Sequence, residues 1–212
     1  MTVKLIHVTP KGDELIAYMA RVSNPSNQDN PNFSKLIHYL IKHKHWSPFE
    51  MVNMCVEINT TRSISAQILR HRSFSFQEFS QRYADIDELD LPKSPKLRTQ
   101  DLTNRQNSIE TDDIDTLNWE SSIQLSYFHA YTLYKNLIKS SIAKECARDV
   151  LPMGSPTKLY MNGNLRSWLH YIDLRSANGT QKEHQTIAND VKLLVKQHFP
   201  LSYSAFFNLN DT

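Results

Sequence analysis

The stretch "LRHRSFSFQEFSQRY" at residues 69–83 concentrates three arginines, one histidine, one glutamate and three serines. A guanidinium group binds phosphate or carboxylate through two parallel hydrogen bonds, and serine hydroxyls and backbone amides complete such a site. Glu78 is the exception among these charges, because a carboxylate accepts hydrogen bonds from the base or sugar of a nucleotide and does not attract its phosphate. A nucleotide site is therefore one interpretation of the stretch. On charge alone, the favoured interpretation is a cationic helix end stabilised by the helix dipole.

The overall composition restricts the remaining classes of function. The chain has 212 residues, enough for one domain with a substantial core, and 40% of them are hydrophobic. Its formal net charge is only +2, so no overall field favours nucleic acid or a membrane, and anion binding has to be local. The four glycines form neither a Rossmann fingerprint nor a Walker loop. With no membrane span or signal peptide in the sequence, we expect a soluble, cytoplasmic protein with a single domain over residues 1–212.

Hydrophobic periodicity predicts a helix-rich α+β domain with a small antiparallel or mixed sheet that is not a Rossmann fold. Alternating apolar residues predict a half-buried strand at 51–59. Residues 85–113 are polar, contain two prolines and no aromatic residue, and are expected to form a loop or surface excursion. Further strands are expected at 3–8 and 157–163, and helices after Thr9-Pro10 (stripe Leu15, Ile16, Met19, Val22), from Phe33 to Trp46, at 61–71, 115–140, 143–152 and 164–175, and after a capping box at Thr180 and Glu183.

A second group of arginines lies in the C-terminal half of the chain. On the predicted 164–175 helix, Arg166 and His170 share one face, and Arg175 points nearly the opposite way. Arg148 precedes this helix. Polar groups on two sides of one helix suit an element that lies between two ligand positions or between subunits. A surface helix with solvated arginines is the alternative.

Metal and thiol chemistry have little support in the sequence. His38, His43 and His45 lie close together but form no HExxH motif and no Cys/His ligand spacing, so no metal site is predicted. His45 is instead expected at a helix end beside a turn. Cys146 lies close to Arg148 and is a candidate nucleophile, although a small buried cysteine is the commoner outcome.

The spacing within residues 70–82 is more specific than their charge. Arg70, His71, Arg72, Ser75, Ser80 and Arg82 fit the pattern RHRxxSxxxxSxR. This pattern resembles the motif of flavin-dependent thymidylate synthases, which are unrelated in fold to the thymidylate synthases that use a catalytic thiol. Segments similar to the family's others occur in the right order: "HWSPFE" at 45–50, "ARDVLP" at 147–152 and "NLRSWLHYIDLR" at 164–175. The resemblance covers roughly residues 1–205.

The resemblance implies an activity, its cofactors and an assembly. The family forms homotetramers that bind FAD at subunit junctions and use NADPH to reduce it. A methylene group passes from 5,10-methylenetetrahydrofolate to dUMP, which gives dTMP and tetrahydrofolate. Because the reduced flavin carries the hydride, the resemblance makes a structural role for Cys146 the expectation.

The resemblance also assigns the site residues. Arg175 resembles the catalytic arginine that polarises the uracil ring, and His45 resembles a residue on the flavin or folate side. The dUMP contacts would be Gln67, Arg70, Glu78, Ser80, Gln81, Arg82, Arg148 and Arg175. The FAD contacts would be Ser47, Arg70, His71, Arg72, Glu78, Asn164, Arg166 and His170.

Two departures from the family pattern and two other functions stay open. Met51 stands where the family often has a histidine, and the polar contact that the family has near Gly179 is replaced here, with Glu183 and His184 as candidates. A nucleotide-binding protein of the same fold without catalysis is the second hypothesis. A nucleic-acid binder with a basic patch is the third, and a steep salt dependence of binding would distinguish it.

Overall fold

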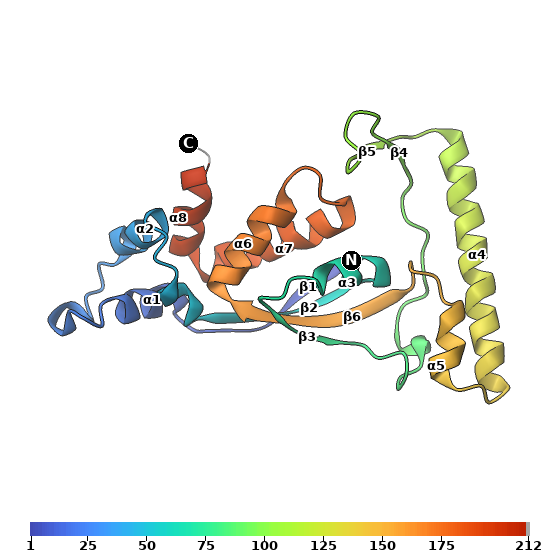
Figure 1. The fold of residues 1–212 in the computed structure, drawn as a ribbon, viewed down its shortest axis with the longest axis horizontal. Coiled ribbons are helices and arrows are strands. Elements are labelled where there is room, and N and C mark those ends of the chain that lie inside the picture. The colour runs from blue at the N-terminus through green and yellow to red at the C-terminus, as the bar shows by residue number, and fades with distance from the viewer. Residues whose placement is uncertain (211–212) are drawn as a thin grey trace.

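An antiparallel sheet forms the centre of the computed structural model, which describes residues 1–210 (Figure 1). Its strand order is β1-β2-β6-β3, so the two strands with the longest pairing, β2 and β6, lie in the middle. The predicted alternation at 51–59 is confirmed, because Met54, Val56 and Ile58 are fully buried on one face of β2. The strands are β1 (Thr2–Val8), β2 (Asn53–Thr61), β3 (Ser75–Glu78) and β6 (Pro156–Asn164).

Two helices cover one face of this sheet and complete the main core (Figure 1). They are α6 (Leu165–Ser176) and α7 (Lys182–His198). The predicted stripe of α6 is confirmed, because Leu165, Trp168, Leu169 and Ile172 are all fully buried. Burial of each such side chain contributes about 1.5–3 kcal/mol. The indole Nε1 of Trp168 also donates a 3.0 Å hydrogen bond to the carbonyl oxygen of Met54, which fixes α6 on β2.

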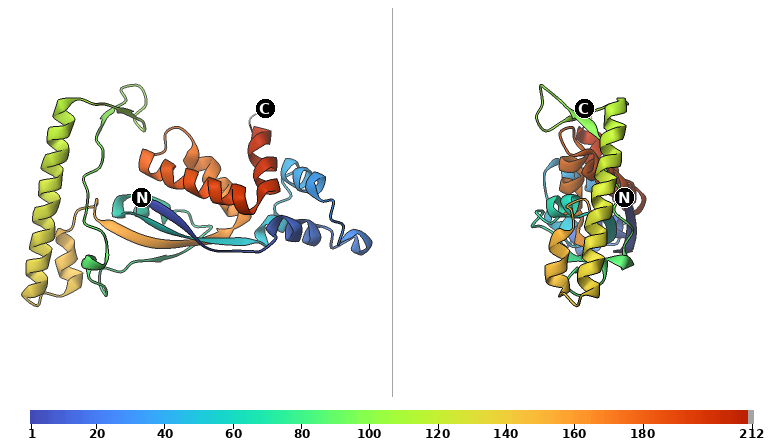
Figure 2. Two further views of the ribbon diagram at one scale, coloured as in Figure 1. Left: turned by 180° about the vertical axis from the view of Figure 1, so that it is seen from behind. Right: turned by 90° about the vertical axis from the view of Figure 1, so that its right-hand side faces the viewer.

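The N-terminal helices pack with the last helix at one end of the molecule (Figures 1 and 2). Asp13 is buried and accepts hydrogen bonds from the backbone N–H groups of Leu201 (2.8 Å) and Ser202 (3.2 Å), so its carboxylate caps the last helix. The elements here are α1 (Gly12–Ala20), η1 (Pro25–Asn27), α2 (Ser34–Lys42), η2 (Ser47–Glu50) and α8 (Pro200–Asn210).

Several predicted helix ends are wrong. Lys11 is left-handed (φ 52°), so α1 begins after it and Thr9-Pro10 is no cap. Val22 is 68% exposed because it lies in the turn beyond α1. The second helix ends at Lys42, short of Trp46.

The predicted capping box at Thr180 and Glu183 does not form either. Gln181 occupies the N-cap of α7 without a side-chain cap, so Thr180 lies before the helix, and the carboxylate of Glu183 binds Arg98.

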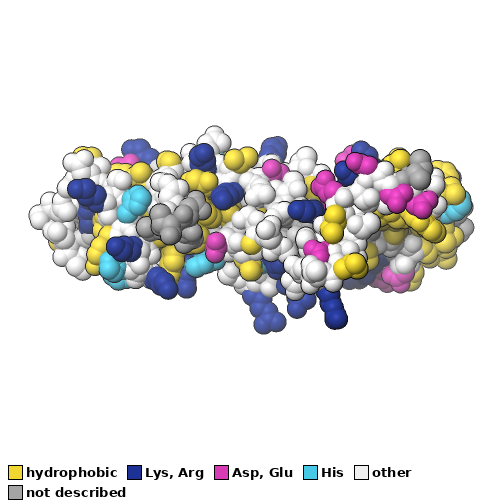
Figure 3. Space-filling view, turned by 90° about the horizontal axis from the view of Figure 1, so that it is seen from above, with side chains coloured by type: hydrophobic (Ala, Val, Ile, Leu, Met, Phe, Trp, Pro, Cys, Tyr) yellow, Lys and Arg dark blue, Asp and Glu magenta, His cyan; other side chains and the backbone are white. Residues whose placement is uncertain are grey.

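A long helix, α4, stands across the far end of the molecule (Figures 1 and 2). The aromatic-rich helix predicted at 115–140 is confirmed, but only Tyr134 of its aromatic side chains is fully buried, in a small second core with Ile86, Ala147 and Leu151. Hydrophobic side chains gather on the surface at this end (Figure 3). The elements here are η3 (Ile86–Glu88), β4 (Arg98–Gln100), β5 (Ser108–Glu110), α4 (Ile114–Lys139), α5 (Lys144–Ala147) and η4 (Arg148–Val150). Helix α3 (Arg62–Ile68) instead packs on β2 and β6 of the central sheet (Figure 1).

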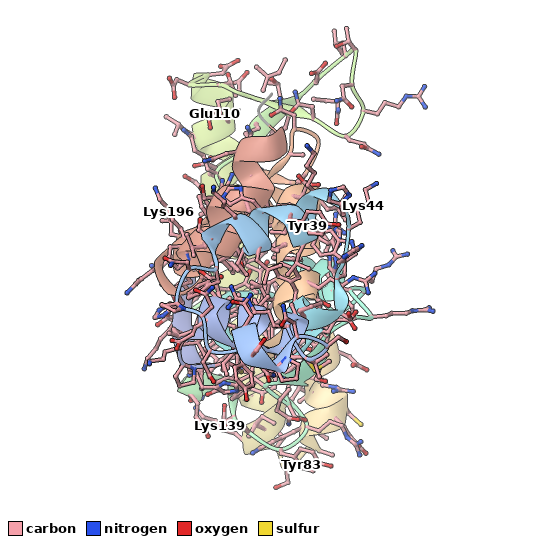
Figure 4. All side chains as sticks on the ribbon, turned by 90° about the vertical axis from the view of Figure 1, so that its left-hand side faces the viewer. Tyr39, Lys44, Tyr83, Glu110, Lys139 and Lys196 are labelled. Atoms are coloured by element: carbon pink, nitrogen blue, oxygen red, sulfur yellow. The ribbon has the colours of Figure 1, made fainter. Side chains whose placement is uncertain are left out.

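The predicted excursion at 85–113 carries more structure than expected. Strands β4 and β5 form a small hairpin, with Thr99 paired to Ile109. Viewed along the long axis, Glu110 lies at one edge of the molecule, and Tyr83 and Lys139 lie at the other (Figure 4). Within residues 1–210, no helix combines the length and the apolar character needed to cross a membrane.

Candidate active site

The 69–83 stretch runs from a helix end to an edge strand. Helix α3 ends at Ile68, a turn carries Arg70 to Arg72, and β3 then pairs with β6 so that Glu78 lies opposite Leu159. Strand β3 is not predicted from the sequence, because its four residues, "SFQE", are too few and too polar for a hydrophobic alternation. The strand separates the two arginine-bearing parts of the stretch.

Glu78 is held by two hydroxyl groups at the end of β3. Its Oε1 accepts hydrogen bonds from Ser65 Oγ (2.7 Å) and Thr157 Oγ1 (3.0 Å). Its Oε2 has no hydrogen-bond partner among residues 1–210. One oxygen therefore anchors the side chain, and the other is available to accept a hydrogen bond from a ligand.

Arg175 and His71 form the central pair of the candidate site. The Nε of Arg175 donates a 2.9 Å hydrogen bond to Nε2 of His71. Burial and the neighbouring guanidinium lower the pKa of His71 to about 4, so its ring is neutral and accepts this bond. Arg175 uses Nε here, and its two terminal nitrogens have no hydrogen-bond partner in the described part of the chain.

His184 lies behind this pair and is fully buried. Its Nδ1 is 3.2 Å from Oε1 of Gln67, and its Nε2 is 3.1 Å from the hydroxyl oxygen of Tyr171. Burial, with Arg175 and His71 nearby, lowers the pKa of His184 to about 4. Sequence reasoning offered His184 and Glu183 as ligand contacts near Gly179, but both side chains are engaged inside the protein.

A third group of residues lies on the other side of α6. Asn164 caps this helix by accepting a 2.9 Å hydrogen bond from the backbone N–H of Ser167. Arg166 forms an ion pair with Glu50 of η2. His170 packs edge-on against Trp46, with ring centroids 4.9 Å apart.

Burial and Arg166 lower the pKa of His170. Glu50 was missed as a site residue, although an acid in the "SPFE" turn was a visible signal. Ser47 begins the same turn and is exposed, as is His45 just before it at the predicted helix end.

The remaining predicted dUMP contacts lie beside α5, in the part of the molecule that carries α4. Arg82 forms an exposed ion pair with Glu145 at 3.0 Å. Ser80 accepts a long 3.4 Å hydrogen bond from the backbone N–H of Arg82, and Gln81 is buried. Cys146 is exposed, so the expected burial of this thiol is wrong, because α5 turns that side outward.

Three arginines of the predicted site have no side-chain partner among residues 1–210. Arg70 and Arg72 are exposed and Arg148 is half-buried, and none of them has a side-chain hydrogen bond or ion pair within the described residues. Unsatisfied arginine forks suit phosphate groups. By contrast, no group of three His, Cys, Asp or Glu side chains within residues 1–210 converges as metal ligands would.

One chain thus brings only part of the predicted site together. The structure joins Gln67, His71 and Arg175 through direct contacts and shared neighbours. The Arg166–His170 group and the Arg82–Arg148 group lie on other parts of the surface. The prediction that α6 presents polar groups on two sides is confirmed, because Arg166 binds Glu50 and Arg175 binds His71.

Comparisons with known proteins identify the family of this chain. Residues 4–201 match the family model described as thymidylate synthase complementing protein. A probable flavin-dependent thymidylate synthase from Paramecium bursaria Chlorella virus 1 is 48% identical over 209 residues, covering 94% of this chain and 96% of the relative. A flavin-dependent thymidylate synthase from Synechocystis sp. is also 48% identical, over 194 residues, covering 91% and 87%.

A solved structure confirms the fold. The UMP/dUMP methylase PolB from Streptomyces cacaoi, bound with 5-Br dUMP, superposes with a TM-score of 0.85 at 27% identity, covering 98% of this chain and 94% of PolB. The predicted helix-rich α+β class is therefore confirmed. The chain belongs to the thymidylate synthase complementing protein family, whose members matched here are described as flavin-dependent thymidylate synthases.

Proposed function

We propose that this chain methylates dUMP to dTMP, with 5,10-methylenetetrahydrofolate as carbon donor, NADPH-reduced FAD as hydride carrier and tetrahydrofolate as product. Family membership supports this reaction. The single structural observation that carries it is the Arg175–His71 pair, which holds a guanidinium with its terminal nitrogens free. A fixed cation of this kind stabilises negative charge that develops on a uracil ring.

The dUMP contacts follow from which polar groups are free. We assign the substrate phosphate to the unpartnered Arg70 and Arg148 and to Arg82, whose ion pair with Glu145 is exposed, because phosphate prefers forked guanidinium donors. Glu78 accepts a hydrogen bond from the sugar or base through its free Oε2. Gln67 contacts the substrate beside Arg175, and the backbone near Ser80 and Gln81 closes the site.

The residues present also fit FAD. The unpartnered guanidinium groups of Arg70 and Arg72 suit its diphosphate, and the Glu50–Arg166 pair with His170 offers charged and aromatic groups for the rest of the cofactor. His71, Ser47, Asn164 and His45 border this position. When bound, FAD supplies the hydride, so the reaction needs no nucleophile from the protein.

We further propose that the enzyme is a cytoplasmic homotetramer whose subunits share sites. The predicted contacts are divided between three parts of one chain, so completing a site needs residues from neighbours. An apolar surface supports this assembly: Leu117, Trp119, Leu125 and Phe128 of α4 are each at least 55% exposed. Buried between subunits, these side chains would stabilise the assembly by the hydrophobic effect.

The test is an assay of dTMP formation by purified protein. We expect yellow protein whose flavin bleaches under anaerobic NADPH, and dTMP after dUMP and methylenetetrahydrofolate are added. Bleaching without dTMP would instead support a nucleotide-binding protein that lacks catalysis. Light scattering at four times the subunit mass of 24.7 kDa is the expected result for the assembly, and a monomer would contradict shared sites.

A further inference from the structure

A continuous chain of hydrogen bonds joins the 85–113 excursion to Gln67. At its outer end, Arg98 of β4 binds both carboxylate oxygens of Glu183, at 2.8 Å and 3.0 Å. This pair is largely shielded from solvent, with side chains 14% and 16% exposed. The Nε of Arg98 also donates to Ser108 Oγ (2.9 Å), which ties the pair to the β4–β5 hairpin.

The inner part of the chain runs through two amides to His184. The Nε2 of Gln181 donates to Glu183 at 2.9 Å, and the Nε2 of Gln67 donates to Oε1 of Gln181 at 2.7 Å. Oε1 of Gln67 is then left to face His184 Nδ1, while the other ring nitrogen faces Tyr171. Each glutamine amide therefore donates through its nitrogen and accepts through its oxygen, and the Glu183 carboxylate accepts three hydrogen bonds, two from Arg98 and one from Gln181.

The carboxylate fixes the direction of every bond in this chain. An ionised carboxylate only accepts hydrogen bonds, so Gln181 has to turn its NH₂ group toward Glu183 and its oxygen toward Gln67. Gln67 then has to turn its own NH₂ toward Gln181 and its oxygen toward the Nδ1–H of His184. Burial opposes ionisation of Glu183, but hydrogen bonds from Arg98 and Gln181 outweigh it and lower the pKa. The carboxylate is thus charged at neutral pH.

The orientation of the Gln67 amide matters because the hydrogen bonds to Gln181 and His184 use only part of its hydrogen-bonding capacity. One amide hydrogen and one oxygen lone pair remain for a ligand. If the amide flipped, the donor and acceptor would exchange places toward that ligand. A bound nucleotide would then meet an unsatisfied pair of polar groups.

We propose that Glu183, held by Arg98, is a positioning residue that sets the orientation of the Gln67 amide toward dUMP. The inference rests on the proposed function, in which Gln67 contacts the substrate. It makes the 85–113 excursion part of the binding apparatus, because the hairpin holds Arg98 and Arg98 holds the carboxylate. Met51 and the flavin-side residues play no part in it.

Exchanging the charges of Arg98 and Glu183 tests whether Glu183 orients the Gln67 amide or only tethers the excursion to α7. In the double variant Arg98→Glu with Glu183→Arg, the ion pair remains, but a guanidinium now stands where the carboxylate was. Gln181 then has to turn its oxygen toward position 183, and the reversal passes through Gln67 to His184. We expect FAD binding to match wild type and dUMP affinity to fall roughly 10- to 100-fold, the usual effect of unsatisfied buried hydrogen-bonding groups.

A second readout does not depend on the substrate. Nitrogen-15 NMR of the histidine side chains should show His184 protonated at Nδ1 in wild type and at Nε2 in the exchanged variant. Lys96→Met is the matched control, because it breaks only the exposed 4.0 Å pair with Glu110 in the same excursion. We expect this control to bind dUMP as wild type does.

The outcomes are distinguishable. A wild-type holoenzyme that binds no dUMP overturns the proposed function, and the inference with it. If wild type binds dUMP and the exchanged variant binds it equally well, the inference alone is wrong and Glu183 is only a tether. If His184 keeps its wild-type tautomer in the exchanged variant, the inference is also wrong, since the hydrogen bonds between position 183 and His184 have then not reversed direction.

Discussion

Polar side chains around Arg175 satisfy one another inside the protein, whereas Arg70, Arg72 and Arg148 have no side-chain partner among residues 1–210. The first group has its geometry set before any ligand binds, because Arg175, His71, Gln67 and His184 are each held by at least one hydrogen bond within the protein. The second group retains its hydrogen-bonding capacity for a phosphate or for a neighbouring subunit. The comparison predicts that substitutions in the first group alter chemistry or stability, and that substitutions in the second alter binding alone.

Arg175→Ala should have the largest effect. Removing a fixed cation that stabilises developing negative charge should lower the rate of dTMP formation by about 10³-fold. Reduction of bound FAD by NADPH should continue nearly unchanged, because it does not use this cation. Stopped-flow absorbance of the flavin and a dTMP assay measure the two steps separately. Arg105→Ala, in the exposed excursion, is the control, and turnover that survives Arg175→Ala would contradict the assigned role.

Arg148→Ala tests the unpartnered group. It should raise KM for dUMP about 10- to 100-fold through loss of charge-assisted hydrogen bonds. The melting temperature should stay within about 1 °C of wild type, because the side chain has no partner within the described residues to lose. For Arg148→Lys, KM for dUMP should lie between the values of wild type and Arg148→Ala, since lysine keeps the charge but not the forked donors of a guanidinium. A large fall in melting temperature without a change in KM would remove the distinction between the groups.

Acid should destabilise the satisfied group. The pKa of buried His184 is about 4 in the folded protein, against an ordinary value of 6.5. Between pH 6.5 and about 4, His184 is protonated in the unfolded chain but neutral in the folded protein. The free energy of unfolding therefore falls as the pH drops through this range. For this fully buried ring, we expect a loss of about 2 kcal/mol in the free energy of unfolding. The pKa of half-buried His71 is also lowered, so this residue adds to the loss of stability in acid.

Urea denaturation at several pH values measures this effect. His184→Gln keeps one donor and one acceptor but does not titrate, so its stability should depend less on pH. A pH dependence equal to that of wild type would show that His184 is not the group responsible.

The smallest effect is expected for Cys146→Ala. The thiol is exposed, and hydride delivery by FAD makes a protein nucleophile unnecessary. The turnover number should stay within about two-fold of wild type. A folded but inactive variant would restore the candidate nucleophile.

Elements whose buried side chains recur at a regular spacing could be predicted from the sequence. The alternation on β2 and the stripe on α6 are local patterns of large side chains, and both were placed correctly. The short polar strand β3 carries no such pattern, and α8 was overlooked. Both predicted caps are wrong, because left-handed Lys11 is the N-cap of α1 and Gln181, not Thr180, is the N-cap of α7.

The site divides in the same way. Its motif residues could be proposed from the spacing in 70–82 alone. The network behind them could not, because its members meet across large separations: Gln67 and His184 are 117 positions apart, and Arg98 and Glu183 are 85. Hydrogen bonds of that range depend on the folded geometry, and no local pattern specifies them.

The buried carboxylate of Asp13 has a consequence for synthesis of the chain. Asp13 is synthesised early, whereas Leu201 and Ser202, whose backbone N–H groups donate to its carboxylate, follow 188 and 189 positions later. Until then, the charge has to stay in water, since burying it without a partner is costly. Helix α1 thus cannot pack in its final position until residues 201 and 202 have been made, so folding at this end is completed late.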